Sequence, residues 1–258
     1  MTAFVEQGQG EPAVLLLHGI GGGKSIWSGT LPALAAAGVR AAALDFPGYG
    51  DSPGRPTLAA MVDAVGSTVA RLGAARTVLV GHSMGGMVAQ EWVALHPGCV
   101  QGLVLACTSA SFGKADGEWQ ARFVAERLAP LDAGLGMDGM ARRLVPAMVA
   151  PGASDAAREA AIAVMARVPE ASYRVALEAI AAFDRRAALP AIAVPTLCLA
   201  AEHDRTAPPE VMQRMAQRIP GAEYHCLTDA GHIANVEQPA AFQAALLSFL
   251  KRHFDIGG

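Results

Sequence analysis

The sequence lacks a strong excess of either charge, and it lacks any long hydrophobic run. Its 258 residues include 20 Lys and Arg and 23 Asp and Glu, which give a net charge of −3. No basic stripe indicates a surface for nucleic acid, and no acidic tail indicates a solvating segment. The longest apolar runs, such as residues 13–17 and 193–201, have fewer than ten residues and are too short to span a bilayer. We therefore expect neither a nucleic-acid partner nor a membrane-spanning segment.

Cysteine is also scarce. The four cysteines, at positions 99, 107, 198 and 226, form no C-x-x-C pair, and three of them lie in or beside strand-like runs. This pattern favours buried, reduced thiols over disulfides or metal ligands. The N-terminus has no charged region followed by an apolar run, so no signal peptide is expected. Together these absences predict a cytoplasmic protein.

Short apolar runs alternate with helical segments along the chain. The runs are continuously apolar, which is typical of strands that helices cover on both faces of a parallel sheet. They comprise residues 13–17, 41–45, 77–80, 103–107, 196–201 and 223–227. Apolar residues make up 52% of the chain, which is enough to build such a sheet. The pattern predicts an α/β fold with a mostly parallel, doubly wound sheet.

One stretch, residues 112–186, interrupts this alternation. It contains no convincing strand, and it is rich in Ala, Arg, Glu and Met at helical spacing. Proline and glycine residues divide it into several helices. We predict that it is a helical cap inserted into a core formed by residues 1–111 and 187–258. Because α/β sheets bind ligands at the carboxyl ends of their strands, the cap is a candidate lid.

The most specific motif is Gly-His-Ser-Met-Gly at residues 81–85, which matches G-x-S-x-G. It follows the strand-like run 77–80 and precedes a helical segment, as this motif requires. Ser83 is then expected on a tight strand-to-helix turn, where the flanking glycines remove side chains that clash. The N-terminus of the helix directs backbone N–H groups beside the hydroxyl, where they can stabilise an oxyanion. We predict that Ser83 is a nucleophile rather than a helix-capping serine.

A serine nucleophile needs a base, usually a histidine that a carboxylate holds in place. In this type of fold the chain order is Ser, acid, His. Asp204 lies in the loop after one strand-like run, and His232 lies at a glycine turn after the last run, so both fit that order. Glu202 is the alternative acid, and Asp229 better suits a turn or helix cap. The other histidines fit other motifs, a strand, helix ends or the position before the acid: His18, His82, His96, His203, His225 and His253.

The second oxyanion donor is expected from the loop after the first central strand. This loop, residues 18–23, reads His-Gly-Ile-Gly-Gly-Gly, and its glycines let the backbone approach a substrate closely. We assign the two donors as the N–H groups of Ile20 and Met84, with Gly21 as the fallback for Ile20. The loop lacks the complete G-x-x-x-x-G-K-[ST] phosphate motif and the G-x-G-x-x-G dinucleotide motif, so we expect no nucleotide site.

Together these motifs resemble those of the α/β-hydrolase superfamily. The matching segments span nearly the whole chain: residues 18–22, 45–52, 81–86, 202–204 and 231–232. A finer resemblance to the esterase and 3-oxoadipate enol-lactonase branch rests on residues 168–173, 182–186, 194–196 and 232–239. The resemblance implies the α/β-hydrolase fold and no metal or organic cofactor. Two departures stand out: relatives usually begin with a β-hairpin, whose outermost strand is expected to be missing here, and Ala201 replaces a common glycine before Asp204.

The residues and the resemblance imply a serine hydrolase that cleaves a carboxylic ester or lactone through an acyl-enzyme intermediate. Among enzymes, the alternative is a carbon–carbon bond hydrolase or a perhydrolase with the same three residues. Outside the enzymes, the alternative is a non-catalytic protein that binds a small ligand, because a fold alone does not establish activity. The expected partner is a small-molecule ester or lactone, and a homodimer remains open.

The substrate pocket is expected to be apolar and to lie under the insertion. The insertion has ten basic and ten acidic side chains, so it carries no net charge. Neighbouring opposite charges predict solvated helix faces at residues 126–127, 158–159 and 184–185. Apolar side chains then remain to form the pocket, and we select Trp119, Phe123, Met140 and Leu144. This arrangement predicts a preference for uncharged, small to medium esters over dianionic lactones.

Overall fold

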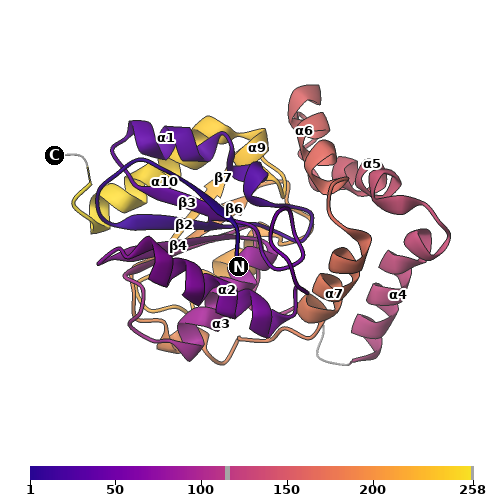
Figure 1. Ribbon diagram of the computed structural model, residues 1–258, viewed down its shortest axis with the longest axis horizontal. Helices are drawn as coiled ribbons and strands as arrows, with labels where there is room; N and C mark the ends of the chain where they lie inside the picture. The colour runs from indigo at the N-terminus through magenta and orange to yellow at the C-terminus, as the bar shows by residue number, and fades with distance from the viewer. Residues whose placement is uncertain (114–116, 257–258) are drawn as a thin grey trace.

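The computed structural model describes residues 1–113 and 117–256. Within these residues, seven strands form one sheet in the order β1-β3-β2-β4-β5-β6-β7 (Figure 1). The strands are β1 (Phe4–Gln7), β2 (Ala13–Leu17), β3 (Ala41–Leu44), β4 (Thr77–His82), β5 (Gly102–Ala106), β6 (Thr196–Ala201) and β7 (Glu223–Leu227). Neighbouring strands are parallel, except that β1 is antiparallel to β3. The chain therefore has the mostly parallel, doubly wound sheet that the sequence predicts.

The six strands predicted from apolar runs are all present, with ends that differ by at most two residues. Strands β2 to β6 are buried at every position, because other elements cover both faces of the sheet. At the opposite edges, β1 and β7 are largely exposed or half-buried. Among the described residues, β1 is the single strand that precedes β2, and it pairs along β3 with Phe4 opposite Leu44. In the described residues, a single strand therefore forms this edge of the sheet.

Alternate side chains of β2 pack in two hydrophobic cores, one on each face of the sheet. Leu15 and Leu17 pack in the core that contains α2, α3 and α8, whereas Val14 and Leu16 pack in the core that contains α1 and α10. This alternation follows from the two-residue period of a strand. Figure 1 shows α1 and α10 across the sheet from α2 and α3. These helices are α1 (Thr30–Ala36), α2 (Leu58–Leu72), α3 (Met84–Leu95), α8 (Pro209–Ala216) and α10 (Pro239–His253).

Four helices of the described residues lie between β5 and β6, and Figure 1 shows them together at one end of the sheet. They are α4 (Glu118–Asp132), α5 (Gly136–Met148), α6 (Asp155–Met165) and α7 (Glu170–Ala181). Backbone hydrogen bonds join the two ends of this insertion. The Phe112 N–H donates to the Phe183 carbonyl at 3.1 Å, and the Arg185 N–H donates to the Ala110 carbonyl at 2.7 Å. Arg185 also pairs with the buried Glu91 carboxylate of α3, at 2.5 Å, so the insertion is anchored where it joins the sheet.

The residues that the structure describes also form three shorter helical segments: the 3₁₀ turns Lys24–Trp27 and Leu189–Ala191, and helix α9 (Ala234–Glu237). In the described part of the chain, no helix has the length and apolar character that crossing a membrane requires.

Candidate active site

Ser83 lies on a strained turn between β4 and α3. Its φ of 53° and ψ of −120° are rare for a residue with a side chain. The turn depends on the glycines beside it. A Cβ atom on Gly81 would lie 2.4 Å from the Gly85 carbonyl oxygen, and one on Gly85 would lie 2.3 Å from the Leu17 carbonyl oxygen. The sharp turn leaves Ser83 half-buried, between residues that are fully buried.

A chain of two hydrogen bonds joins Ser83 to His232 and Asp204. The Ser83 Oγ lies 2.9 Å from His232 Nε2, and His232 Nδ1 lies 2.8 Å from Asp204 Oδ2. The other carboxylate oxygen of Asp204 accepts the N–H groups of Thr206 and Ala207, at 2.8 and 2.9 Å. Asp204 and His232 are each only 2% exposed. With one oxygen of the carboxylate held by the backbone, the other is fixed toward the imidazole, which is the arrangement that orients a histidine base.

Glu237 holds the loop that carries His232, and the sequence reasoning missed it. One of its carboxylate oxygens accepts the N–H groups of Gly231 and Ala150, at 3.0 and 2.6 Å, and the other accepts the N–H of Ile233 at 2.9 Å. The bonds to Gly231 and Ile233 flank His232 on both sides, and the bond to Ala150 ties this loop to the insertion. The only signal in the sequence is a carboxylate five residues after the histidine, and nothing in that spacing reveals three backbone bonds.

Two other histidines next to the site are buried and serve as hydrogen-bonding groups. His82 Nε2 donates to the His232 carbonyl at 2.6 Å. His18 Nε2 accepts the Phe46 N–H at 3.1 Å, which leaves His18 Nδ1 to donate to the Gly19 carbonyl at 2.8 Å. Burial lowers the pKa of both His18 and His82 to about 4. Both are therefore neutral at pH 7, and each holds part of the backbone around Ser83.

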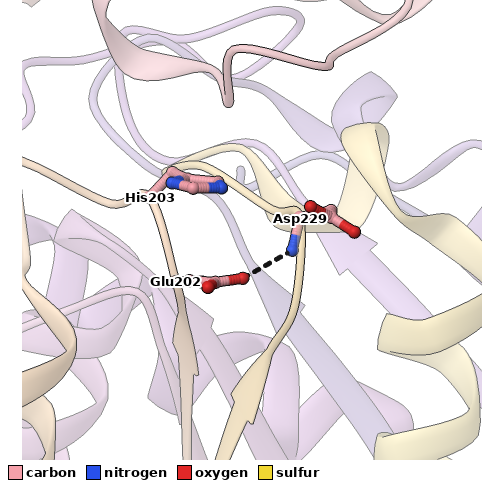
Figure 2. A group of neighbouring side chains, drawn as sticks. All are labelled: Glu202, His203 and Asp229. Atoms are coloured by element: carbon pink, nitrogen blue, oxygen red, sulfur yellow. Dashed lines mark hydrogen bonds between the residues drawn. The ribbon is translucent and has the colours of Figure 1, made fainter.

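Glu202, the alternative acid, bonds to the backbone of Asp229 at the surface of the protein. Figure 2 shows that Glu202 and Asp229 follow neighbouring strands, and that the Glu202 carboxylate accepts the Asp229 N–H, at 3.0 Å. This bond ties the loop that carries Asp204 to the loop that carries His232. His203 lies beside them, with ligand atoms of the three residues within 4.8 Å of one another. All three groups are exposed to solvent, and their geometry alone does not indicate a bound metal.

The two expected oxyanion donors lie on elements that converge at Ser83. Met84 is the first residue of α3, so its N–H has no acceptor within the helix. Ile20 and Gly21 line the cavity beside Ser83. The loop that carries them approaches the serine closely, since a Cβ atom on Gly19 would lie 3.1 Å from the Ser83 Cβ. A side chain at position 19 would therefore push the loop away from the serine.

The cavity beside Ser83 is small, with a volume of about 40 Å³. Its walls include the loop with Ile20 and Gly21, together with His232. The insertion contributes apolar side chains from α5 and α6: Val145, Met148, Ala161 and Met165. Met165 reaches the loop directly, because a Cβ atom on Gly21 would lie 3.3 Å from the Met165 Sδ. The insertion thus covers Ser83 with α5 and α6.

The four expected pocket residues do not line the cavity beside Ser83. Trp119 and Phe123 of α4 stack on each other, with ring centroids 5.3 Å apart, and line a different and larger cavity. Met140 and Leu144 line a groove on α5 next to Phe123. Because each residue of a helix is rotated by about 100° from the last, Val145 lies further round α5 and points toward Ser83. The periodicity identified the helix but not the side that faces the serine.

Comparison with known proteins gives matches over nearly the whole chain. The family model for the alpha/beta hydrolase fold matches residues 12–239. The candidate carbamate hydrolase RutD of Variovorax paradoxus is 34% identical, over 93% of this chain and 92% of its own. The pimeloyl-[acyl-carrier protein] methyl ester esterase of Aromatoleum aromaticum is 32% identical, over 88% of this chain and 94% of its own.

Solved structures match the fold in the same way. A thermophilic esterase from Thermogutta terrifontis, with malate bound, has a TM-score of 0.86 and 29% identity, covering 98% of this chain and 94% of its own. The enol-lactonase from Burkholderia xenovorans has a TM-score of 0.85 and 26% identity, covering 97% and 96%. The range that the family model matches includes Ser83, Asp204 and His232. The chain belongs to the α/β-hydrolase family.

Proposed function

We propose that this protein is a serine hydrolase that cleaves small carboxylic esters or lactones through an acyl-enzyme intermediate. Ser83 is the nucleophile, His232 the general base and Asp204 the acid that orients the imidazole. The observation that carries the proposal is the pair of hydrogen bonds from Ser83 Oγ to His232, at 2.9 Å, and from His232 to Asp204, at 2.8 Å. Relatives named as an esterase and an enol-lactonase support this reaction class.

The reaction follows from the positions of these groups. His232 Nε2 takes the proton from Ser83 Oγ as that oxygen attacks the carbonyl carbon. The N–H groups of Ile20 and Met84 donate to the oxyanion that forms, with Gly21 as the fallback for Ile20. His232 then gives its proton to the leaving alcohol, and a water molecule, activated by the same imidazole, hydrolyses the acyl-enzyme. Each step moves one proton, and His232 and Ser83 return to their starting states.

The cavity beside Ser83 supports a short, uncharged acyl group as the preferred substrate. A cavity needs roughly 10–15 Å³ of volume for each water-sized group that it holds. The cavity beside Ser83, at about 40 Å³, therefore holds about three heavy atoms. The insertion side chains that line it are apolar, which disfavours a carboxylate in the acyl chain. Residues 112–186 then act as the cap of the core formed by residues 1–111 and 187–258, with α5 and α6 as the lid over Ser83.

A carbamate is the second candidate substrate, because RutD of Variovorax paradoxus is a candidate carbamate hydrolase. Carbamates and esters undergo the same attack by a serine at a carbonyl carbon, so the proposed triad serves both. The two candidates differ in the leaving group and in the substituent on the carbonyl. Parallel assays with a phenyl acetate and a phenyl carbamate distinguish them, since the preferred substrate has the higher kcat/KM.

The experiment that tests the proposed nucleophile is the substitution Ser83→Ala. Removing the Ser83 hydroxyl is expected to lower hydrolysis of nitrophenyl acetate by about four orders of magnitude or more. Ser67→Ala is the control, because the Ser67 hydroxyl donates within α2, to the Ala64 carbonyl at 3.1 Å. That variant should keep full activity. Unchanged turnover in purified, folded Ser83→Ala protein, or equal losses in both variants, would exclude Ser83 as the nucleophile.

A further inference from the structure

A second and much larger cavity lies between the insertion and the sheet core. Its volume is about 660 Å³, which is within the usual range for small-molecule sites. Its walls come from α4, from residues 109–113 at the start of the insertion, and from the loop and helix after Asp204. None of its lining residues also lines the cavity beside Ser83. We call it the arginine cavity, for the residues described next.

Five arginines line the arginine cavity, and none of the described residues that line it is an aspartate or glutamate. They are Arg127, Arg186, Arg205, Arg214 and Arg218. They gather in one place although the chain as a whole has a net charge of −3. Asp184 offsets part of this charge: its bond to Arg186 and the charge of Arg218 lower the pKa of Asp184. Counting only the described residues, Arg205, Arg214 and Arg218 form no ion pair, and all three are exposed to solvent.

Unpaired arginines repel one another, and a concave wall concentrates their potential where an anion can enter. Guanidinium groups bind carboxylate and phosphate with two parallel hydrogen bonds. The cavity also has apolar walls, formed by Trp119, Phe123, Leu189 and Met215. The rings of Trp119 and Phe123 stack on each other and add apolar surface to this wall.

We infer that the arginine cavity binds a small organic molecule that carries two or more carboxylate or phosphate groups together with an apolar part. Several anionic groups are needed because the arginines belong to separate elements. Arg127 belongs to α4, Arg214 to α8, and Arg205 to the loop that leads from Asp204 to α8. This site is separate from the cavity beside Ser83, because the described residues that line the two cavities do not overlap. Binding of the ligand there therefore does not depend on the proposed hydrolysis.

The site adjoins the loop that holds Asp204. Thr206 lines the arginine cavity, and the Thr206 N–H donates to the Asp204 carboxylate at 2.8 Å. Arg205, which also lines the cavity, lies between these two residues in the sequence. An anion on Arg205 therefore contacts the same loop that orients Asp204.

Binding is measured by calorimetry with the whole protein and three probes: citrate, benzene-1,2,4-tricarboxylate and benzoate. Citrate tests the anionic groups alone, the aromatic tricarboxylate adds an apolar part, and benzoate has that part with one charge. We expect the aromatic tricarboxylate to bind at least tenfold more tightly than either of the others, and added NaCl to weaken it. The half-buried Trp119 gives an independent fluorescence signal, because Trp27 and Trp92 are buried elsewhere. Trp119→Phe should remove that signal.

The double variant Arg214→Gln/Arg218→Gln is expected to weaken binding of the aromatic tricarboxylate at least tenfold, and circular dichroism checks that it is folded. Arg55→Gln/Arg76→Gln is the matched control, because it removes the same charge from residues outside the cavity. The Ser83→Ala variant should bind as the unaltered protein does, which separates this inference from the proposed function. Equal affinities of the two double variants would overturn it. Binding of a polyglutamate peptide without binding of the tricarboxylates would also overturn it, in favour of an acidic protein partner.

Discussion

Met165 offers the sharpest test of how the cavity beside Ser83 selects a substrate. Its side chain closes the cavity from α6 and reaches the loop that carries Ile20 and Gly21. Met165→Ala removes the Cγ, Sδ and Cε atoms, which frees space for about three more heavy atoms. We expect the acyl preference to move from propionate in the unaltered protein to hexanoate in the variant.

The size of this change follows from the transfer of methylene groups. Each methylene that enters an apolar cavity contributes about 0.8 kcal/mol, which is about fourfold in kcat/KM. Three methylenes therefore raise the ratio of hexanoate to propionate hydrolysis by up to about 60-fold. The protein should lose about 2–5 kcal/mol of stability at the same time, because Met165 is only 4% exposed and the surrounding atoms close the space incompletely.

The assay compares kcat/KM for nitrophenyl esters from acetate to octanoate. Met140→Ala is the matched control: Met140 is also a buried methionine of the insertion, 0% exposed, and it does not line the cavity beside Ser83. It should lose similar stability and keep the original chain-length profile. An unchanged profile in Met165→Ala, or the same shift in both variants, would refute the assignment of this cavity to the acyl group.

Three further predictions concern the groups around the nucleophile. Burial lowers the pKa of His18 and His82 to about 4, so the unfolded chain binds more protons than the folded one between about pH 6.5 and 4. The free energy of unfolding should therefore fall by on the order of 5 kcal/mol as the pH drops from 7 to 4.5, which urea unfolding at these two pH values measures. Asp204→Asn should lower kcat by about three to four orders of magnitude with the fold retained, whereas Glu202→Gln should change kcat little, which a nitrophenyl ester assay checks. Glu237→Gln should lower kcat by up to about 100-fold with KM nearly unchanged, because the loop that carries His232 loses acceptors for its N–H groups; a rise in KM alone would contradict this role.

The residues of the proposed triad could be predicted from sequence because local constraints single them out. Ser83 requires a turn that only flanking glycines allow, and the atoms that a Cβ would meet at positions 81 and 85 show why. Asp204 and His232 each follow a strand of a parallel sheet, and the carboxyl ends of such strands meet at one edge. The prediction of the proposed triad therefore rested on the order of strands and helices along the chain, and the apolar runs in the sequence reveal that order well.

Glu237 and His82 could not be predicted in the same way, because their roles depend on contacts between distant backbone segments. Glu237 accepts an N–H from Ala150, which lies 87 residues earlier in the chain. His82 donates to the carbonyl of His232, 150 residues later. A glutamate in a helix or a histidine at the end of a strand has many equivalent interpretations in a sequence, and only the packed structure distinguishes between them.

The positions of the charged side chains in the insertion were also beyond what the sequence could predict. Neighbouring acidic and basic residues predict local pairs, yet Arg127 lies over the Phe123 ring at 5.2 Å, and Arg185 pairs with Glu91, which is 94 residues away. A segment with no net charge can therefore have its basic side chains on one face and its acidic side chains on another. Arg127 of the insertion meets Arg214 and other arginines of the core at a single cavity, and neither segment alone reveals that concentration of charge. Where an anion binds is thus a property of the assembled fold, and the net charge of a segment says little about it.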